Sequence, residues 1–213
     1  YAGIQHFFTR TMVRSWNIFH QITWKRDQTL PTILSLKEVK TIINALPTLQ
    51  SHSFYLSLYS LGLRLREATT LQVRDILSDR GLVHIHGGKG ALDRMVPLPN
   101  ITLYSLRQYY KTHRNPQWIF PALGHNGGKD AQFAKDHVSD SGVQGVLKRT
   151  LKRLGFKKHI HPHVFRHAYA THLLEANIPI GHVQKILGHK TLKSTMVYLH
   201  VTTQAQTDSH ARV

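Results

Sequence analysis

Residues 161–201 read HPHVFRHAYATHLLEANIPIGHVQKILGHKTLKSTMVYLHV, and the interpretation of the whole chain starts from them. Pro162 suits the first turn of a helix, where its missing N–H would have no partner, so we predict that a helix begins there. His163, Arg166 and His167 then lie at i, i+3 and i+4, on one face near the helix N-terminus. Because helix N-termini attract anions, this stretch predicts an anion-binding cluster.

Two further motifs follow in the same stretch. Gly188 is placed to end a short helix and to leave His189 just beyond it, and Tyr198 lies on a last helical pattern that starts near Thr191. Arginine binds phosphate oxygens, histidine transfers protons near neutral pH, and tyrosine can form an ester with phosphorus. Each residue alone has a simpler explanation as a solvated arginine, a capping histidine or a packing tyrosine. Their combination in this order favours phosphodiester chemistry.

The order of these motifs resembles the catalytic domain of tyrosine recombinases, the phage integrase and Xer-like family. That family carries an arginine in a G-L-R motif, a lysine in a β-hairpin, an H-x-x-R box, an L-G-H motif and a nucleophilic tyrosine. The matching residues, in chain order, are Arg64, Lys89, His163, Arg166, His189 and Tyr198. The resemblance covers roughly residues 31–213, and it implies that these six residues are catalytic.

The G-L-R motif ends at Arg64 and is followed by a predicted helix. Leu65, Ala68 and Leu71 give that helix an apolar face, and Glu67 matches the acidic residue that commonly follows the arginine in the family. Without the resemblance, Arg64 would be interpreted as a surface residue.

A β-hairpin is predicted over residues 82–98. Residues 82–86 alternate apolar and polar side chains as a half-buried strand does, residues 87–90 form a turn, and residues 94–98 return. The turn contains Lys89. A nucleotide-binding P-loop is excluded, because that motif needs Gly at 83 and Ser or Thr at 90, where the chain has Val83 and Gly90.

Most of the remaining chain is predicted to be helical. Ser35 and Glu38 form a capping-box pattern that starts a helix ended by Pro47. Further helices are predicted over residues 51–62, 103–112 and 143–154, and residues 121–141 are predicted to form a long exposed loop. The expected fold is therefore mainly α with a small antiparallel β-sheet, the fold that the resemblance implies.

One face of the predicted helix over 143–154 is strongly basic. Such a face is most often solvated, but next to a phosphodiester site it is a candidate DNA-backbone contact. Its members are Lys148, Arg149, Lys152 and Arg153.

The composition agrees with a nucleic-acid partner. The 213 residues include 28 Lys plus Arg against 11 Asp plus Glu, a formal net charge of +17, which favours a polyanionic partner, most simply nucleic acid. The resemblance implies that this partner is double-stranded DNA. No apolar run approaches the roughly 18 residues that a membrane span needs. The chain has no cysteine, which excludes disulfides and fits a cytoplasmic, nucleoid-associated protein.

No cofactor and no catalytic metal are expected. His163 and His167 are four residues apart, as in helical zinc peptidases, but no glutamate follows the first histidine and no cysteine is present. Carboxylate ligands are scarce in this part of the chain.

The domain organisation also follows from the resemblance. Residues 1–30 are expected to be the end of a truncated N-terminal core-binding domain plus a linker, and residues 31–213 the catalytic domain. The alternative for residues 1–30 is a free N-terminal arm.

The resemblance implies a site-specific DNA recombinase or integrase that works without metal or ATP, as a homotetramer on two DNA sites. Tyr198 would form a 3′-phosphotyrosyl link, Arg64 and Arg166 would neutralise the phosphate, and Lys89 would protonate the departing 5′-oxygen. His163 would assist proton removal from Tyr198, and His189 would hydrogen-bond the phosphate. The alternatives are a type IB topoisomerase, which shares this chemistry, and a catalytically silent DNA-binding relict.

Overall fold

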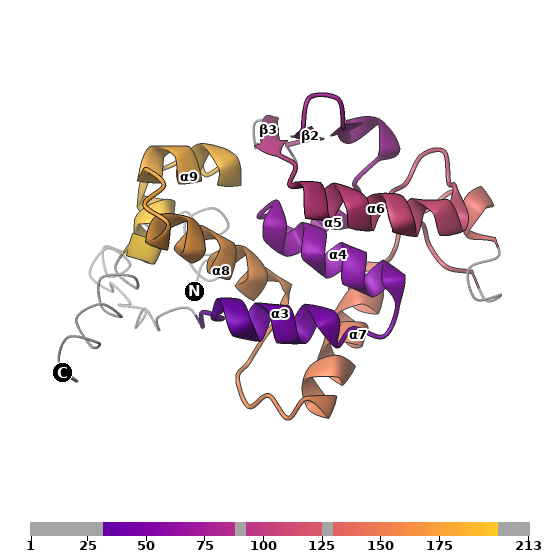
Figure 1. Cartoon of the computed structure of the whole chain (residues 1–213), viewed down its shortest axis with the longest axis horizontal. Helices are drawn as coiled ribbons and strands as arrows, with labels where there is room; N and C mark the ends of the chain where they lie inside the picture. The colour runs from indigo at the N-terminus through magenta and orange to yellow at the C-terminus, as the bar shows by residue number, and fades with distance from the viewer. Residues whose placement is uncertain (1–31, 88–92, 125–129, 200–213) are drawn as a thin grey trace, which may run out of the picture. The chain divides into compact units, whose positions relative to one another are not determined.

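The computed structural model describes residues 32–87, 93–124 and 130–199, and it confirms a mainly helical fold with a small antiparallel sheet (Figure 1). The predictions for residues 1–30 and for the turn with Lys89 lie outside the described residues. The helices are α3 (Leu36–Asn44), α4 (Leu49–Ser60), α5 (Leu65–Thr69), α6 (Asn100–His113), α7 (Asp140–Arg153), α8 (Pro162–Glu175) and α9 (Ile180–Leu187). Two 3-10 turns, η2 (Val73–Asp75) and η3 (Ala131–Phe133), and a helical segment over 193–199 complete them.

The first helices begin where side chains satisfy the free backbone N–H groups. The capping box predicted for α3 is confirmed, because Glu38 accepts from the Ser35 N–H at 2.8 Å and Ser35 Oγ accepts from the Glu38 N–H at 3.2 Å. Helix α4 begins two residues earlier than predicted, because Thr48 Oγ1 accepts from the Ser51 N–H at 3.1 Å and so caps it.

The sheet has the order β1-β2-β3, with all neighbours antiparallel. The predicted hairpin is β2 (Leu82–Ile85) and β3 (Arg94–Pro97), in which Val83 pairs with Val96. Strand β1 (Ile76–Leu77) was not predicted, because two residues are too short to show an alternating pattern.

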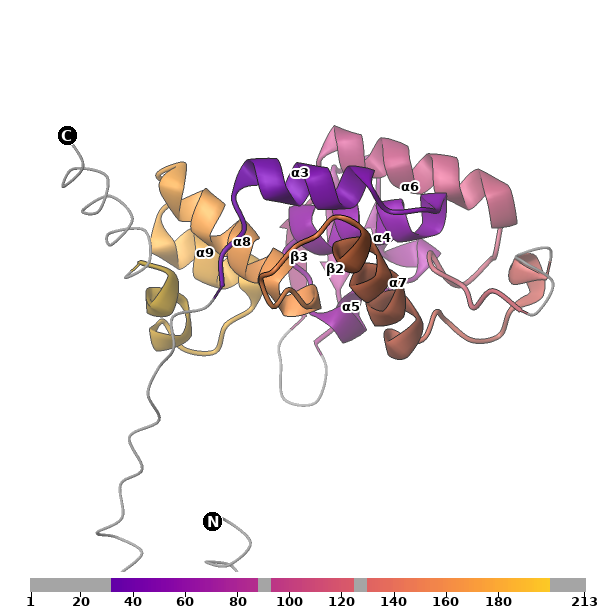
Figure 2. The same cartoon turned by 90° about the horizontal axis from the view of Figure 1, so that it is seen from below.

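Helix α4 lies at the centre of the main core. It packs against α3, α6 and α8, while α5 and α7 lie together on the opposite side from α3 and α6 (Figure 2). The largest side chains that are fully buried in this core include Phe54, Tyr55, Leu58, Phe120 and Phe165.

A second, smaller apolar cluster joins α8, α9 and the segment over 193–199. Its buried members are Ala170, Val183, Leu187 and Tyr198. Helix α9 also contacts β3, so one helix end lies between the hairpin and α8.

The segment predicted as one long loop over 121–141 is partly structured. Among its described residues, η3 forms one turn, and α7 already begins at Asp140 because Ser139 Oγ accepts from the Gly142 N–H at 3.1 Å. The Asn115 amide donates to the carbonyl of Ala131 at 2.8 Å and so fastens this segment to the end of α6.

In the part of the chain that the structure describes, no helix is long and apolar enough to cross a membrane.

Candidate active site

Arg64 lies at the N-terminus of α5, immediately after the turn that ends α4. Gly62 makes this turn with a φ of 59°, a conformation that favours glycine. The Arg64 backbone N–H and its guanidinium Nη1 both donate to Glu67, at 2.8 and 2.7 Å. The arginine and the acidic residue of this motif are therefore held as one unit.

Glu67 also holds two other arginines. Arg94 of β3 donates to both of its carboxylate oxygens, at 2.9 and 2.7 Å, and Arg166 Nη1 of α8 lies 3.8 Å from it. The Glu67 side chain is only 7% exposed. Burial alone would raise its pKa, but the hydrogen bonds and charges of Arg94 and Arg64 lower the pKa of Glu67 to about 2. We call Arg64, Arg94 and Arg166 the arginine cluster.

The C-terminal end of α9 fixes the same three arginines. Its carbonyls have no partner within the helix, and the helix dipole makes this end negative. Arg94 Nε donates to the carbonyl of residue 186 at 2.7 Å, Arg166 Nη2 donates to that of residue 187, and Arg64 Nη2 donates to that of residue 188 at 3.3 Å. Three successive carbonyls thus bind three different guanidinium groups.

Arg166 is the most enclosed member of the cluster, at 4% exposure, and its Nη1 also donates to the Gly62 carbonyl at 2.6 Å. Burial, followed by the charge of Arg64, lowers the pKa of Arg166 to about 10. The guanidinium therefore keeps its positive charge at neutral pH.

Gly188 ends α9, as predicted, with a φ of 64°. The chain then places His189, whose Nδ1 lies 2.8 Å from the hydroxyl oxygen of the buried Thr195. Burial and the charges of Arg166 and Arg64 lower the pKa of His189 to about 4, so the ring is neutral at pH 7. With Nδ1 occupied by Thr195, its Nε2 is left for a ligand.

Tyr198 is 4% exposed, and its hydroxyl lies 2.7 Å from Nδ1 of His167. Burial, and then the nearby histidines and Arg166, lower the pKa of His167 to about 4. A neutral imidazole can accept the phenolic proton. Burial raises the pKa of Tyr198, whereas the charges of Arg166 and Arg64 lower it.

The comparisons with known proteins agree with this geometry. The sequence profile of the phage integrase family matches residues 32–205. The chain belongs to this family. The resemblance inferred from the motifs is thereby confirmed.

Curated relatives in the phage integrase family share about a third of their residues with this chain. It is 34% identical over 182 residues to tyrosine recombinase XerA of Thermococcus kodakarensis, covering 84% of this chain and 62% of the relative. It is 34% identical over 190 residues to tyrosine recombinase XerD of Oceanobacillus iheyensis, covering 86% of this chain and 62% of the relative. The chain thus spans about three fifths of the length of these relatives.

Two solved structures share the fold. The crystal structure of XerA recombinase superposes with a TM-score of 0.72 at 20% identity, covering 99% of this chain and 81% of that one. The Tn1549 transposon integrase in complex with transposon right end DNA gives a TM-score of 0.70 at 14% identity, covering 96% and 75%.

Of the six residues that the family motifs predict, the structure brings four together: Arg64, Arg166, His189 and Tyr198. His163, the fifth, lies in the first turn of α8 and is exposed, although partial burial of its ring, followed by the charges of Arg166 and Arg64, lowers its pKa. Lys89 lies outside the described residues.

Two residues of this candidate site, Arg94 and Thr195, were not predicted as functional, whereas His167 was predicted as part of the anion-binding cluster but without a catalytic role. Arg94 lies in the predicted returning strand of the hairpin, and His167 shares a helix face with His163 at i+4, so both had a signal in the sequence. Thr195 had none, because only the folded chain brings its hydroxyl to His189.

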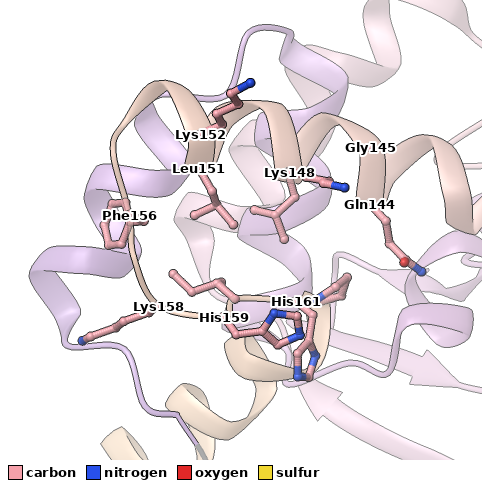
Figure 3. Close-up of a pocket in the computed structure, with 12 residues that line it drawn as sticks. Gln144, Gly145, Lys148, Leu151, Lys152, Phe156, Lys158, His159 and His161 are labelled. Carbon is pink, nitrogen blue, oxygen red and sulfur yellow. The ribbon is translucent and has the colours of Figure 1, made fainter.

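The predicted basic face of α7 is exposed, and part of it lines a hollow of about 600 Å³ between α7 and residues 156–162 (Figure 3). Lys148 and Lys152 line one wall, and His159 and His161 the other. Arg153 is committed elsewhere, because its Nη2 donates to the Ala45 carbonyl of α3.

Proposed function

We propose that this chain is the catalytic part of a site-specific DNA recombinase or integrase. The observation that carries the proposal is the pairing of the Tyr198 hydroxyl with a neutral His167, beside three fixed guanidinium groups. Such an arrangement can activate a phenol and neutralise a phosphate at one place. We also propose that residues 1–30 join this domain to an N-terminal core-binding domain.

In the first step, the Tyr198 oxygen attacks the phosphorus of a DNA phosphodiester while its proton passes to His167 Nδ1. The oxygen–phosphorus bond to the 5′-oxygen breaks, which leaves a 3′-phosphotyrosyl link and a free 5′-hydroxyl. Arg64 and Arg166 neutralise the non-bridging oxygens as charge develops. A 5′-hydroxyl from another strand reverses the step, so that the exchange needs neither ATP nor a metal ion.

The geometry supports His167 as the proton acceptor in place of His163, because the hydrogen bond to Tyr198 is made by His167. His163 lies exposed beside Arg166, where a bound phosphate would reach it, and His189 offers Nε2 to the same phosphate. Lys89 as the general acid for the 5′-oxygen rests on the family resemblance.

Tyr198 is packed against Ala170, Val183 and Leu187, and so its hydroxyl is shielded from a phosphate in solution. For the attack, the helical segment over 193–199 has to shift so that DNA reaches the hydroxyl, which stays within reach of His167 and beside the arginine cluster.

The proposed substrate is double-stranded DNA. The net charge of +17 and the exposed basic face of α7 would attract its phosphate backbone. We propose that Lys148, Arg149 and Lys152 contact the phosphate backbone, with Arg153 at the edge of that surface. A homotetramer on two DNA sites, in the nucleoid of a cell, is the assembly that strand exchange by this chemistry requires.

The decisive experiment uses nicked suicide duplexes, selected from a random-sequence pool for covalent capture by this chain. The matched variant is Tyr198→Phe, which keeps the ring and removes the hydroxyl. We expect a covalent protein–DNA complex on a denaturing gel for the wild type and none for the variant, with unchanged DNA binding. A covalent complex that persists in Tyr198→Phe would overturn the proposal.

Lys89 is tested with DNA whose bridging 5′-oxygen is replaced by sulfur. An alkoxide needs a proton to leave, whereas a thiol, with a pKa of roughly 8.5, does not. Lys89→Ala should cleave ordinary DNA very slowly and recover most of its rate on the sulfur substrate. Arg166→Ala should not recover. Equal defects of Lys89→Ala on both substrates would assign Lys89 to binding instead.

The DNA-contacting surface is tested by the salt dependence of binding. Lys148→Ala and Lys152→Ala should weaken binding to all sequences alike and reduce the salt slope by about 1 for each lysine. The matched control is Lys37→Ala, which removes an exposed lysine from α3. A slope that stays unchanged in both α7 variants would exclude this face.

Strand exchange between two labelled duplexes separates a recombinase from its alternatives. Relaxation of supercoiled DNA without exchange would favour a type IB topoisomerase, and binding without any covalent complex would favour a silent relict.

A further inference from the structure

A cluster of two histidines and a carboxylate lies on the β-sheet, apart from the tyrosine and the arginines. Strand β2 has the alternating burial of a half-buried strand, with Val83 and Ile85 in the core. His84 and His86 are two residues apart and therefore share the other face. Asp75, at the end of η2, lies next to them.

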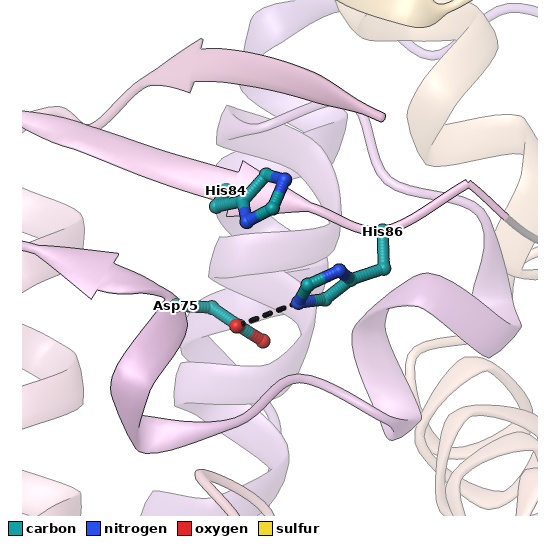
Figure 4. Close-up of side chains that lie close together, drawn as sticks. All are labelled: Asp75, His84 and His86. Carbon is teal, nitrogen blue, oxygen red and sulfur yellow. Dashed lines mark hydrogen bonds and ion pairs between the residues drawn. The ribbon is translucent and has the colours of Figure 1, made fainter. Parts of the chain in front are cut away.

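The three side chains converge (Figure 4). Asp75 Oδ1 lies 2.9 Å from His86 Nε2, the two imidazole centroids are 4.3 Å apart, and one ligand atom from each of the three residues lies within 4.8 Å of the others. Asp75 is only 3% exposed, and its other oxygen, Oδ2, accepts from the Gln72 backbone N–H at 2.9 Å. Its position is thus fixed by the backbone, whatever the histidines do.

A small hollow of about 20 Å³ lies against this cluster, and its lining includes Glu67 and Thr70 as well as Asp75, His84 and His86. A cavity needs roughly 10–15 Å³ to hold one water-sized particle. The hollow therefore has room for one ion, and for little else.

We infer that Asp75, His84 and His86 form a binding site for a single Zn²⁺ ion. Two imidazole nitrogens and one carboxylate oxygen are a common zinc ligand set, with water in the fourth position. Hard ions such as Mg²⁺ prefer oxygen ligands and are disfavoured by the two imidazoles. A cation at this place also compensates the buried charge of Asp75.

Asp93 completes the surroundings of the site. Its Oδ2 lies 3.1 Å from His84 Nε2 and 3.5 Å from His86 Nδ1, and its Oδ1 accepts from the Gly87 N–H at 2.8 Å. Metal-bound histidines usually donate their second ring N–H to a carboxylate, which fixes the ring orientation. Asp93 is placed for this role.

The zinc site is independent of the proposed strand cleavage, because none of its three ligands touches the tyrosine or the phosphate-binding arginines among the described contacts. It is nevertheless next to the cleavage site, since Glu67, which holds the arginine cluster, lines the same hollow. Binding of zinc would tie η2 to the β2–β3 hairpin and stabilise the folded chain.

The test is isothermal titration of the tag-free chain with ZnCl₂, at pH 7.5, with MgCl₂ as the comparison ion. The expected result is one tight Zn²⁺ site, no comparable Mg²⁺ site and a higher melting temperature with zinc. His84→Gln/His86→Gln should weaken the tight site by about tenfold or more. The control is His52→Gln/His182→Gln, which removes as many of the 17 histidines elsewhere and should leave binding unchanged.

Equal zinc affinity in both double variants, or no tight site in the wild type, would overturn the inference. X-ray absorption of the zinc-loaded wild type provides a second measurement that does not depend on how a variant folds. It should show two imidazoles at about 2.0–2.1 Å. A zinc spectrum without imidazole ligands would contradict the assignment.

Discussion

The arginine cluster and the tyrosine segment over 193–199 both depend on α9, but they are held in different ways. The cluster is fixed by a buried carboxylate and by three successive carbonyls at the end of α9. Among the described contacts, the tyrosine segment is held by a small apolar cluster and by side-chain hydrogen bonds between His167 and Tyr198 and between His189 and Thr195.

This difference separates two tasks of the site. Charges that stabilise a transition state work best when they are already in place, because no energy is then spent on moving them during the reaction. A nucleophile that has to reach a phosphate on bound DNA needs a weaker attachment. The carbonyls at the end of α9 thus hold the arginines in place, while the apolar side chains of α9 only pack against the tyrosine segment.

The largest effect is expected on the rigid side, from Glu67→Gln. Removing the charge of a buried partner leaves three arginines uncompensated, which costs about 3–5 kcal/mol of unfolding free energy. Urea denaturation measures this loss. The matched control, Glu38→Gln, removes a carboxylate paired to Lys158 at the surface and should cost less than about 1 kcal/mol. Similar losses for both variants would contradict a special role for Glu67.

The stability difference between the wild type and Glu67→Gln should also depend on pH. Because the pKa of Glu67 is lowered to about 2 in the folded chain, its contribution is present above the unfolded pKa of about 4.5 and is lost as pH falls toward 2. The stability difference between wild type and Glu67→Gln should therefore shrink over this range.

On the tyrosine side, His167→Asn should slow formation of the covalent complex by about 100- to 1,000-fold, since it removes the group that accepts the phenolic proton. The wild-type rate should be independent of protonation at His167 from neutral pH down to the neighbourhood of pH 4, where His167 becomes charged. The control is His163→Asn. A larger defect in that control would return the proton-accepting role to His163.

Gly188→Ala tests the contacts between the end of α9 and the arginine cluster. A side chain at a φ of 64° costs about 1–2 kcal/mol, and its Cβ would lie 3.0 Å from Arg94 Cδ. Gly155→Ala is a matched control, because Gly155 has a φ of 68° but its Cβ would meet no described atom within 4 Å. Both variants should lose stability in denaturation, and only Gly188→Ala should also lose cleavage rate. Equal cleavage rates of the two variants would show that a displacement of Arg94 does not affect cleavage.

The smallest effect is expected from Thr195→Val, which keeps the shape of the side chain and removes the hydroxyl bonded to His189. Losing one hydrogen bond of this kind costs about 1 kcal/mol. With His189 free to rotate, cleavage should slow by about tenfold. Ser194→Ala, on the exposed side of the same segment, should leave the rate unchanged. A Thr195→Val enzyme with the wild-type rate would show that His189 is oriented by other contacts.

The sequence by itself determined the family and the fold class, and it named most residues of the candidate site. The H-x-x-R box, the Gly188-His189 end of α9 and the spacing to Tyr198 depend only on local rules, in which Pro162 starts a helix, Gly188 ends one, and residues four apart share a face. For the same reason, the capping box of α3 and the β2–β3 hairpin were predictable.

Only the tertiary structure decided which partner each side chain has. Three hydrogen bonds join residues that lie 21 or more positions apart: Glu67 with Arg94, Arg166 with the carbonyl of residue 187, and His167 with Tyr198. Local rules act over one helical turn or two strand residues, so they place a side chain on a face but not against a distant partner. The zinc site follows the same reasoning, because the alternation of β2 puts His84 and His86 on one face, and only the packing of η2 against the sheet adds Asp75.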